Sequence, residues 1–444
     1  MDYLIKDFMG VTVLDKYIDL EDIRRFSETF DQDPKNILAM NAVTKNGIGS
    51  IALNRDAVNR LNHTYSHLIK TPEATSQGKS GRCWLFAGLN TMRLEAMKKM
   101  NLKSFELSQS YPMFWDKLEK ANFFLENIIE TRNEPLNGRL VMWLLANALP
   151  DGGQWDMLVN IIKKYGVVPK SVMPETEASS NSRPMNQILT AKLREYAKML
   201  RDMHERGASV DYLRQAKVEA LEEFYRMLCI YLGKPPEKFF WEWRDKNDQF
   251  HREGEITPQK FYEKYVGLDL DEMICLINAP TKDKPYNRLY TVQYLGNVVG
   301  GQIIRYLNTE IDVLKEAAAS MIMDNRAVWF GCDVGKMLER NLGIMDTEVY
   351  NYPLVFGTKL KLDKAGRLDY GHSRMTHAMV FTGVDIDDDG KPVKWRVENS
   401  WGTKIGDKGY MIMTDKWFDE YLYEITVSKK YLPSELLDVL ETEP

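Results

Sequence analysis

The sequence predicts an α+β protein in which a helical half comes first and an antiparallel β half comes last. Apolar residues recur at helical spacing after Cys83, and further helical patterns continue to about residue 165. The final third instead carries β-branched and aromatic runs bounded by turn residues, in RMTHAMVFTGVDI, VKWRVENSW and KGYMIMTDKW. Early helices and late strands favour two unlike halves that meet at a cleft.

Between these halves, from about 180 to 290, the text is charged, helix-rich and poor in strand character. We interpret it as a helical insertion within a single domain spanning residues 1–444, with strand-like runs returning at 288–304. The turn LPDGGQWD at 149–156 interrupts the early helices, and DIDDDG at 385–390 predicts a hairpin turn between two late strands. Residues 433–444 predict a short terminal helix that Ser434 caps.

Composition narrows the class of protein. With 44% apolar residues the chain can bury a sizeable core, and a net charge of −5 makes nucleic acid an unlikely partner. The opening residues are too charged for a secretory signal, and the longest apolar runs, such as VMWLLANAL, are too short to span a bilayer. The four cysteines form no CxxC pair, which suits a reducing compartment. We expect a soluble, cytoplasmic protein without membrane contact.

Cys83 is the candidate nucleophile. It lies in the first turn of its predicted helix, where backbone N–H groups and the helix dipole favour a thiolate. The other cysteines lack such a setting: Cys229 and Cys275 sit among apolar neighbours and Cys332 has no base nearby, so we interpret all three as structural. Gln77, six residues upstream, can supply an N–H that joins the Cys83 backbone N–H in an oxyanion hole.

His377 is the candidate base. It begins the apolar alternation THAMVFTGV, which puts it at one end of a buried strand, whereas the competing His372 in YGHSRM predicts an exposed loop. Asn399 falls near the end of the next strand, where its carbonyl can accept from the imidazole and set the tautomer. The alternative for Asn399 is an ordinary turn asparagine.

Other strings do not support a bound metal or cofactor. DIDDDG imitates an EF-hand loop but has Arg396 where the bidentate glutamate belongs, and GNVVGG is not a dinucleotide motif. His63 and His67 have a helical spacing but no third ligand beside them. We therefore expect neither a metal nor a cofactor.

Together, QGKSGRCW, DGGQW, MTHAMV and VENSWG resemble the papain-like cysteine peptidases. The text FWEWRDKNDQFHREGEITPQKFYEKYV, NRLYTVQYLGNVVGG and AVWFGCDVGK narrows the resemblance to the bleomycin hydrolase / aminopeptidase C family, over nearly the whole chain. Against the papain signature C-G-[SA]-C-[WY], this chain has Ser80 for the first cysteine and Arg82 for the Ser/Ala position. This intracellular family shows the same departure.

The resemblance implies a papain-like two-lobed core with a long helical insertion, assembled as a homohexamer that acts on peptides. It makes Cys83 the nucleophile, His377 the general base and acid, Asn399 the orienting residue and Gln77 the oxyanion donor. Gly152 and Gly153 match the glycine pair along which a substrate backbone lies, although a plain turn is the alternative. Trp401 would cover the His–Asn pair and Trp84 would pack beneath the site, with simple core packing equally open for both.

In this family a C-terminal arm enters the cleft and pairs with the substrate's free amino group. Here no such arm follows the helix at 433–444, so we expect endopeptidase or oligopeptidase action on short peptides. A strict aminopeptidase is the first alternative. A nucleic-acid-binding assembly and a transglutaminase-like acyl transferase are the others, and the Gln77 spacing and NSWG segment disfavour the transferase.

Overall fold

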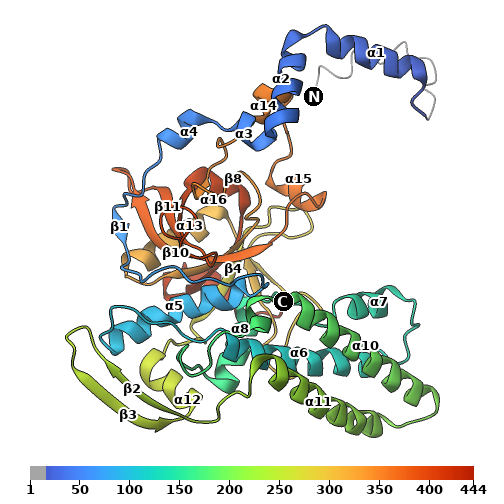
Figure 1. The fold of residues 1–444 in the computed structure, drawn as a ribbon, viewed down its shortest axis with the longest axis vertical. Helices are drawn as coiled ribbons and strands as arrows, with labels where there is room; N and C mark the ends of the chain where they lie inside the picture. Colours follow the sequence, from blue (N-terminus) through green and yellow to red (C-terminus); the bar gives the residue numbers. More distant parts are fainter. Residues whose placement is uncertain (1–16) are drawn as a thin grey trace. The chain divides into compact units, whose positions relative to one another are not determined.

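The computed structural model describes residues 17–444 in two compact units (Figure 1). The smaller unit combines residues 17–58 with 348–361, and the larger one combines 59–347 with 362–444. In the smaller unit Asn54 joins the two stretches, because its backbone N–H donates to the Val349 carbonyl. Its helices are α1 (Leu20–Asp31), α2 (Pro34–Asn46), α3 (Ile48–Ala52) and α14 (Tyr352–Phe356), and α4 (Arg55–Asn59) crosses the boundary.

The larger unit is built on one mixed sheet, in the order β5-β6-β4-β13-β7-β10-β11-β12-β9-β8, with β1 paired to β10. The strands are β1 (His67–Leu68), β4 (Met273–Ile277), β5 (Arg288–Tyr290), β6 (Tyr306–Asn308), β7 (Val328–Cys332), β8 (Leu338–Glu339), β9 (Ile344–Met345), β10 (His377–Ile386), β11 (Pro392–Glu398), β12 (Tyr410–Thr414) and β13 (Leu422–Ser428). The three predicted late strands are confirmed as β10, β11 and β12, and they pair antiparallel. The DIDDDG turn joins β10 to β11, as predicted.

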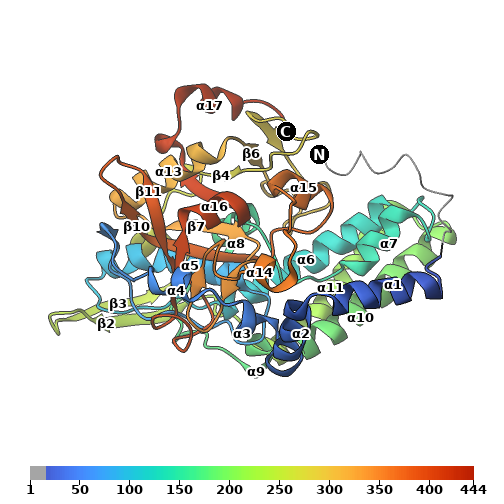
Figure 2. The ribbon, with the colours of Figure 1, turned by 90° about the horizontal axis from the view of Figure 1, so that it is seen from above.

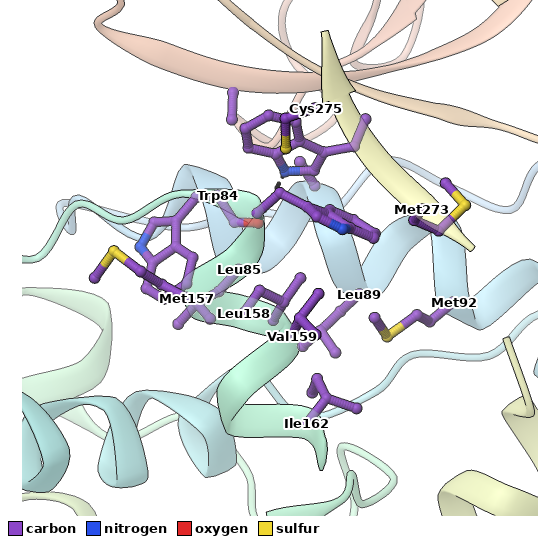
Figure 3. Close-up of a cluster of buried hydrophobic side chains, with 14 of the residues drawn as sticks. Trp84, Leu85, Leu89, Met92, Met157, Leu158, Val159, Ile162, Met273 and Cys275 are labelled. Carbon is purple, nitrogen blue, oxygen red and sulfur yellow. Dashed lines mark hydrogen bonds between the residues drawn. The ribbon is translucent and has the colours of Figure 1, made fainter. Parts of the chain in front are cut away.

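Helices pack against this sheet and against each other. They are α5 (Cys83–Lys99), α6 (Ser110–Glu130), α7 (Arg139–Ala146), α8 (Trp155–Tyr165), α9 (Glu177–Ser180), α13 (Ile311–Met323), α15 (Lys364–Asp369), α16 (Asp415–Tyr421) and α17 (Ser434–Val439). Figure 3 shows side chains of α5, α8 and β4 meeting in a buried apolar cluster. Gly88 allows the close approach of α5 to α8, because a Cβ there would lie 2.0 Å from a Leu158 methyl. The α+β class is confirmed.

Two helices fill the first half of the predicted insertion. α10 (Arg183–Glu205) and α11 (Val210–Leu232) run beside α6 in both views (Figures 1 and 2). The second half differs from the expectation, since β2 (Phe239–Arg244) and β3 (Phe250–Ile256) form a separate antiparallel hairpin, followed by α12 (Pro258–Phe261) and a π-helical turn at Tyr262–Val266. Strand character was hidden there because FFWEWR and FHREGEI mix aromatic and charged residues on a hairpin packed on one face only.

Two further details depart from the sequence analysis. Within 288–304 only Arg288–Tyr290 is a strand, and the rest is turns and loop. Ser434 is the first residue of α17 rather than its cap, and Pro433 precedes it. None of the helices in residues 17–444 is long and apolar enough to cross a membrane.

Candidate active site

Cys83 is the first residue of α5, as the sequence predicts. Arg82 precedes it at the cap position, and its side chain makes no hydrogen bond to the helix end. The first-turn N–H groups of this long helix therefore point toward the Cys83 side, where they favour negative charge. Burial raises the pKa of the Cys83 thiol above its usual value, while hydrogen bonds from the backbone of Ala378 and Trp84 act in the opposite direction.

His377 begins β10 and is buried, and its Nε2 lies 2.8 Å from Oδ1 of Asn399. The backbone N–H of Ser400 also donates to that Oδ1, at 2.7 Å, which identifies the oxygen side of the amide. An oxygen can only accept, so the imidazole carries its proton on Nε2 and leaves Nδ1 free to accept another. The Trp401 indole packs on the His377 ring at a centroid distance of 5.0 Å.

Burial sets the ionisation of His377. It lowers the pKa of His377 to about 4, the hydrogen bond to Asn399 acts to raise it, and the positive charge of Arg340 acts to lower it. The imidazole is therefore neutral at physiological pH, which is the form that accepts a thiol proton. His372, the competing histidine, lies exposed on the loop before β10.

One cavity of about 300 Å³ brings the predicted residues together. Cys83 and His377 line it from the helical and sheet sides, and Gly152 and Gly153 lie along the same wall. Among the described residues that line it there is no Asp or Glu, and Lys120 is its one Lys or Arg side chain. The cavity thus offers a thiol, an imidazole and apolar surface, with no carboxylate for a substrate amine.

The two glycines have different surroundings. A Cβ on Gly153 would lie 2.6 Å from the Trp84 indole, so this position is closed to larger residues by packing. A Cβ on Gly152 would have no atom within 4 Å, so its open side faces space in the cavity wall. Gly152 is therefore the glycine along which a substrate backbone has room to lie.

Gln77 is placed near the nucleophile by the turn that precedes α5. Its Nε2 donates one N–H to the Ser80 carbonyl, and Ser400 Oγ donates to its Oε1 at 2.6 Å. Backbone pairing of Gln77 N with the Ser400 carbonyl joins this turn to the segment that carries Asn399. The second N–H of the Gln77 amide is the one left for an oxyanion.

Sequence reasoning missed the ion pair that holds this turn. Arg82, 1% exposed, makes two hydrogen bonds to the Glu175 carboxylate, at 3.1 and 2.7 Å, and its Nε donates to Ser80 Oγ. Arg82 and Ser80 are the residues that depart from the papain signature. Their positions alone signalled a substitution, but Glu175 lies 93 residues away and carries no local mark.

A second buried pair connects the two halves of the site. Arg93 on α5 donates to Glu398, the residue before Asn399, and neither side chain is more than 2% exposed. Asn90 donates to the same carboxylate oxygen at 2.9 Å. The helix of the candidate nucleophile is thereby tied to the strand end of the candidate orienting residue.

Asp151 links the wall beside Gly152 to three other segments. Its carboxylate accepts from the Gly81 backbone N–H at 3.0 Å, from Lys117 at 2.7 Å and from Ser182. The Asp151 carbonyl accepts from the Trp84 indole N–H at 2.8 Å. Charged residues in the DKLEK stretch of α6 read as a solvated face, so the sequence did not reveal Lys117 as buried.

A thiol at a helix N-terminus that shares a cavity with an asparagine-held imidazole is the site of a papain-like cysteine peptidase. The model of the Peptidase C1-like family matches residues 17–444, and the chain belongs to that family. It is 49% identical to aminopeptidase C of Listeria monocytogenes, over 96% of this chain and 95% of that protein. It is 48% identical to bleomycin hydrolase of Rattus norvegicus, over 96% and 95%. The resemblance drawn from the sequence is confirmed, and with it the enzyme class.

The same fold is seen in a solved relative. The crystal structure of PepW from Lactobacillus rhamnosis matches with a TM-score of 0.95 and 48% sequence identity, and covers 96% of each chain. The arrangement of helices and sheet around the cavity is therefore that of a known peptidase-family structure.

Proposed function

We propose that this chain hydrolyses peptide amide bonds through an acyl-enzyme on Cys83. The observation that carries the proposal is the shared cavity, in which the Cys83 thiol and an imidazole with a free Nδ1 face the same space. The relatives named aminopeptidase C and bleomycin hydrolase support peptide amides as the substrate class.

The reaction follows from the proton positions. His377 Nδ1 accepts the thiol proton, and the thiolate attacks the scissile carbonyl carbon while the carbonyl oxygen becomes an oxyanion. That oxyanion receives the Cys83 backbone N–H and the free N–H of Gln77. The imidazolium then gives its proton to the departing amine as the C–N bond breaks, and Asn399 keeps the ring oriented throughout. Water, activated by the same imidazole, hydrolyses the thioester.

We further propose that a free amino terminus is not required in the substrate. Binding an ammonium group selectively calls for a carboxylate or a set of carbonyl acceptors, and the described lining of the cavity holds no Asp or Glu. Oligopeptidase or endopeptidase action is therefore favoured, with strict aminopeptidase action as the second candidate because of the relatives' name.

The test compares one peptide with a free and with an acetylated amino terminus. Comparable kcat/KM values support oligopeptidase action, and cleavage of the free form alone establishes strict aminopeptidase action instead. Cys83→Ala must abolish both reactions. Hydrolysis that persists in this variant would contradict the proposed nucleophile.

We also propose, on the family resemblance, that the protein assembles as a homohexamer. Sedimentation equilibrium at six times the chain mass supports this, and a monomer mass contradicts it. The acidic net charge of −5 favours peptides over nucleic acid as partners. Single-stranded DNA binding that falls steeply with salt would overturn that preference.

A further inference from the structure

An exposed arginine lies beside the catalytic pair. The Arg340 guanidinium carbon is 4.5 Å from the centre of the Trp401 ring, and the Trp401 ring is 5.0 Å from that of His377. Guanidinium, indole and imidazole thus form one continuous stack, which begins at the buried base and ends at an exposed cation.

The stack is held in place by its backbone. Arg340 opens the turn between β8 and β9, and the Gly343 N–H donates back to its carbonyl. The same turn is fastened to the segment after Trp401, because Gly406 N–H donates to the Asn341 carbonyl at 3.1 Å. Arg340 is therefore a cation with a set position.

The charge of Arg340 is available for a ligand. It forms no ion pair with any residue of 17–444, in contrast to the exposed Arg244 or Arg252, each of which has an acidic neighbour. Stacking on an indole leaves the edge of a guanidinium, with its N–H groups, free to bind a carboxylate in a fork geometry.

The direction of the substrate follows from the chemistry. His377 must reach the departing amine, so the segment that leaves passes His377, while the acyl segment lies along the Gly152 wall. Beyond His377 that segment meets Trp401 and then Arg340. At about 3.4 Å per extended residue, roughly two residues of the departing segment span this stack.

We infer that Arg340 binds a carboxylate of the departing segment, about two residues beyond the scissile bond, and so selects peptides that end in, or carry, an acidic group there. This inference rests on the proposed peptidase function and deepens it. The carboxylate has two possible sources, the peptide's own C-terminus or an Asp or Glu side chain, and both present the same group to the guanidinium.

The test uses three peptides with one acyl segment and a departing dipeptide. The dipeptide ends as a free acid, as a carboxamide, or as a carboxamide with Glu in its second position, and kcat/KM is measured by chromatography. At low ionic strength the wild type should prefer at least one carboxylate-bearing peptide over the neutral one by about three- to tenfold, and the preference should shrink with salt. The arm that shows the preference identifies the source.

Arg340→Gln should bring all three kcat/KM values together, and Arg340→Lys should retain part of the preference. Arg374→Gln, an exposed arginine near the cavity, and the remote Arg226→Gln serve as matched controls and should leave the preference intact. Equal rates for all three peptides in the wild type, or a preference that survives Arg340→Gln, would overturn the inference. Either result leaves the proposed function standing if Cys83→Ala abolishes cleavage.

Discussion

Replacing Glu175 by Gln tests whether an ion pair fixes the turn before the nucleophile. The change keeps the shape of the side chain and leaves the Arg82 charge, 1% exposed, without its counter-ion. Removing one partner of a buried pair costs about 3–5 kcal/mol. The Glu175 side chain is 19% exposed, and Arg82 keeps Ser80 Oγ and the Phe86 ring at 5.1 Å, so we expect about 3 kcal/mol, the lower end of that range.

The assay is urea denaturation followed by tryptophan fluorescence, together with kcat/KM. Glu175→Gln should lower both, because Ser80 and through it Gln77 lose their fixed positions. Arg82→Gln/Glu175→Gln should be more stable than Glu175→Gln, since no uncompensated charge stays buried. Glu255→Gln, which breaks the exposed pair with Lys238, is the control and should change neither quantity. A Glu175→Gln protein as stable and active as the wild type would refute the reasoning.

The pH dependence of this pair has a definite sign. Burial acts to raise the pKa of Glu175, but the hydrogen bonds and charge of Arg82 outweigh it and hold that pKa below its usual value. Because the folded pKa is depressed, the stabilisation is present above the ordinary pKa and is lost as pH falls through the folded one. The stability difference between wild type and Glu175→Gln should therefore shrink on acidification.

Three other outcomes follow from the site. Gly153→Ala should destabilise the fold by about 1–3 kcal/mol, since its methyl group meets Trp84, whereas Gly152→Ala should fold normally and lose roughly tenfold in kcat/KM; equal behaviour of the two variants in urea denaturation would show the assignment to be wrong. Burial raises the pKa of Glu424 to about 8, so folding stability should fall with rising pH between the ordinary glutamate pKa and about 8, by up to about 1.4 kcal/mol per unit, and Glu424→Gln should flatten that slope. The acid limb of kcat/KM should follow the neutral form of His377 with a pKa of about 4, and Arg340→Gln should move it upward; a limb that moves downward in this variant would contradict the charge effect.

Local patterns in the sequence predicted much of the fold and the members of the site. The helix that begins at Cys83 and the strand that begins at His377 each announced themselves by the spacing of apolar residues, and the NSW segment placed Asn399 after the next strand. The structure puts Cys83 and His377 in one cavity and Asn399 behind the histidine.

What the sequence could not provide is pairing over long distances. Glu175 and Glu398 form buried ion pairs with Arg82 and Arg93, but an acidic residue in a helical or strand text has no mark that distinguishes a buried partner from a solvated one. The β2–β3 hairpin was missed for a related reason, because its charged residues suited an exposed helix equally well.

The central claim is that Cys83 becomes acylated while His377 and Asn399 serve its proton transfers. Intact-protein mass spectrometry after rapid acid quench, with a peptide 4-nitrophenyl ester as substrate, measures this directly. We expect one acyl group per active chain, mapped to the peptide that contains Cys83, and none in Cys83→Ala. An acyl group on another residue, or turnover without any acyl group, would contradict the account.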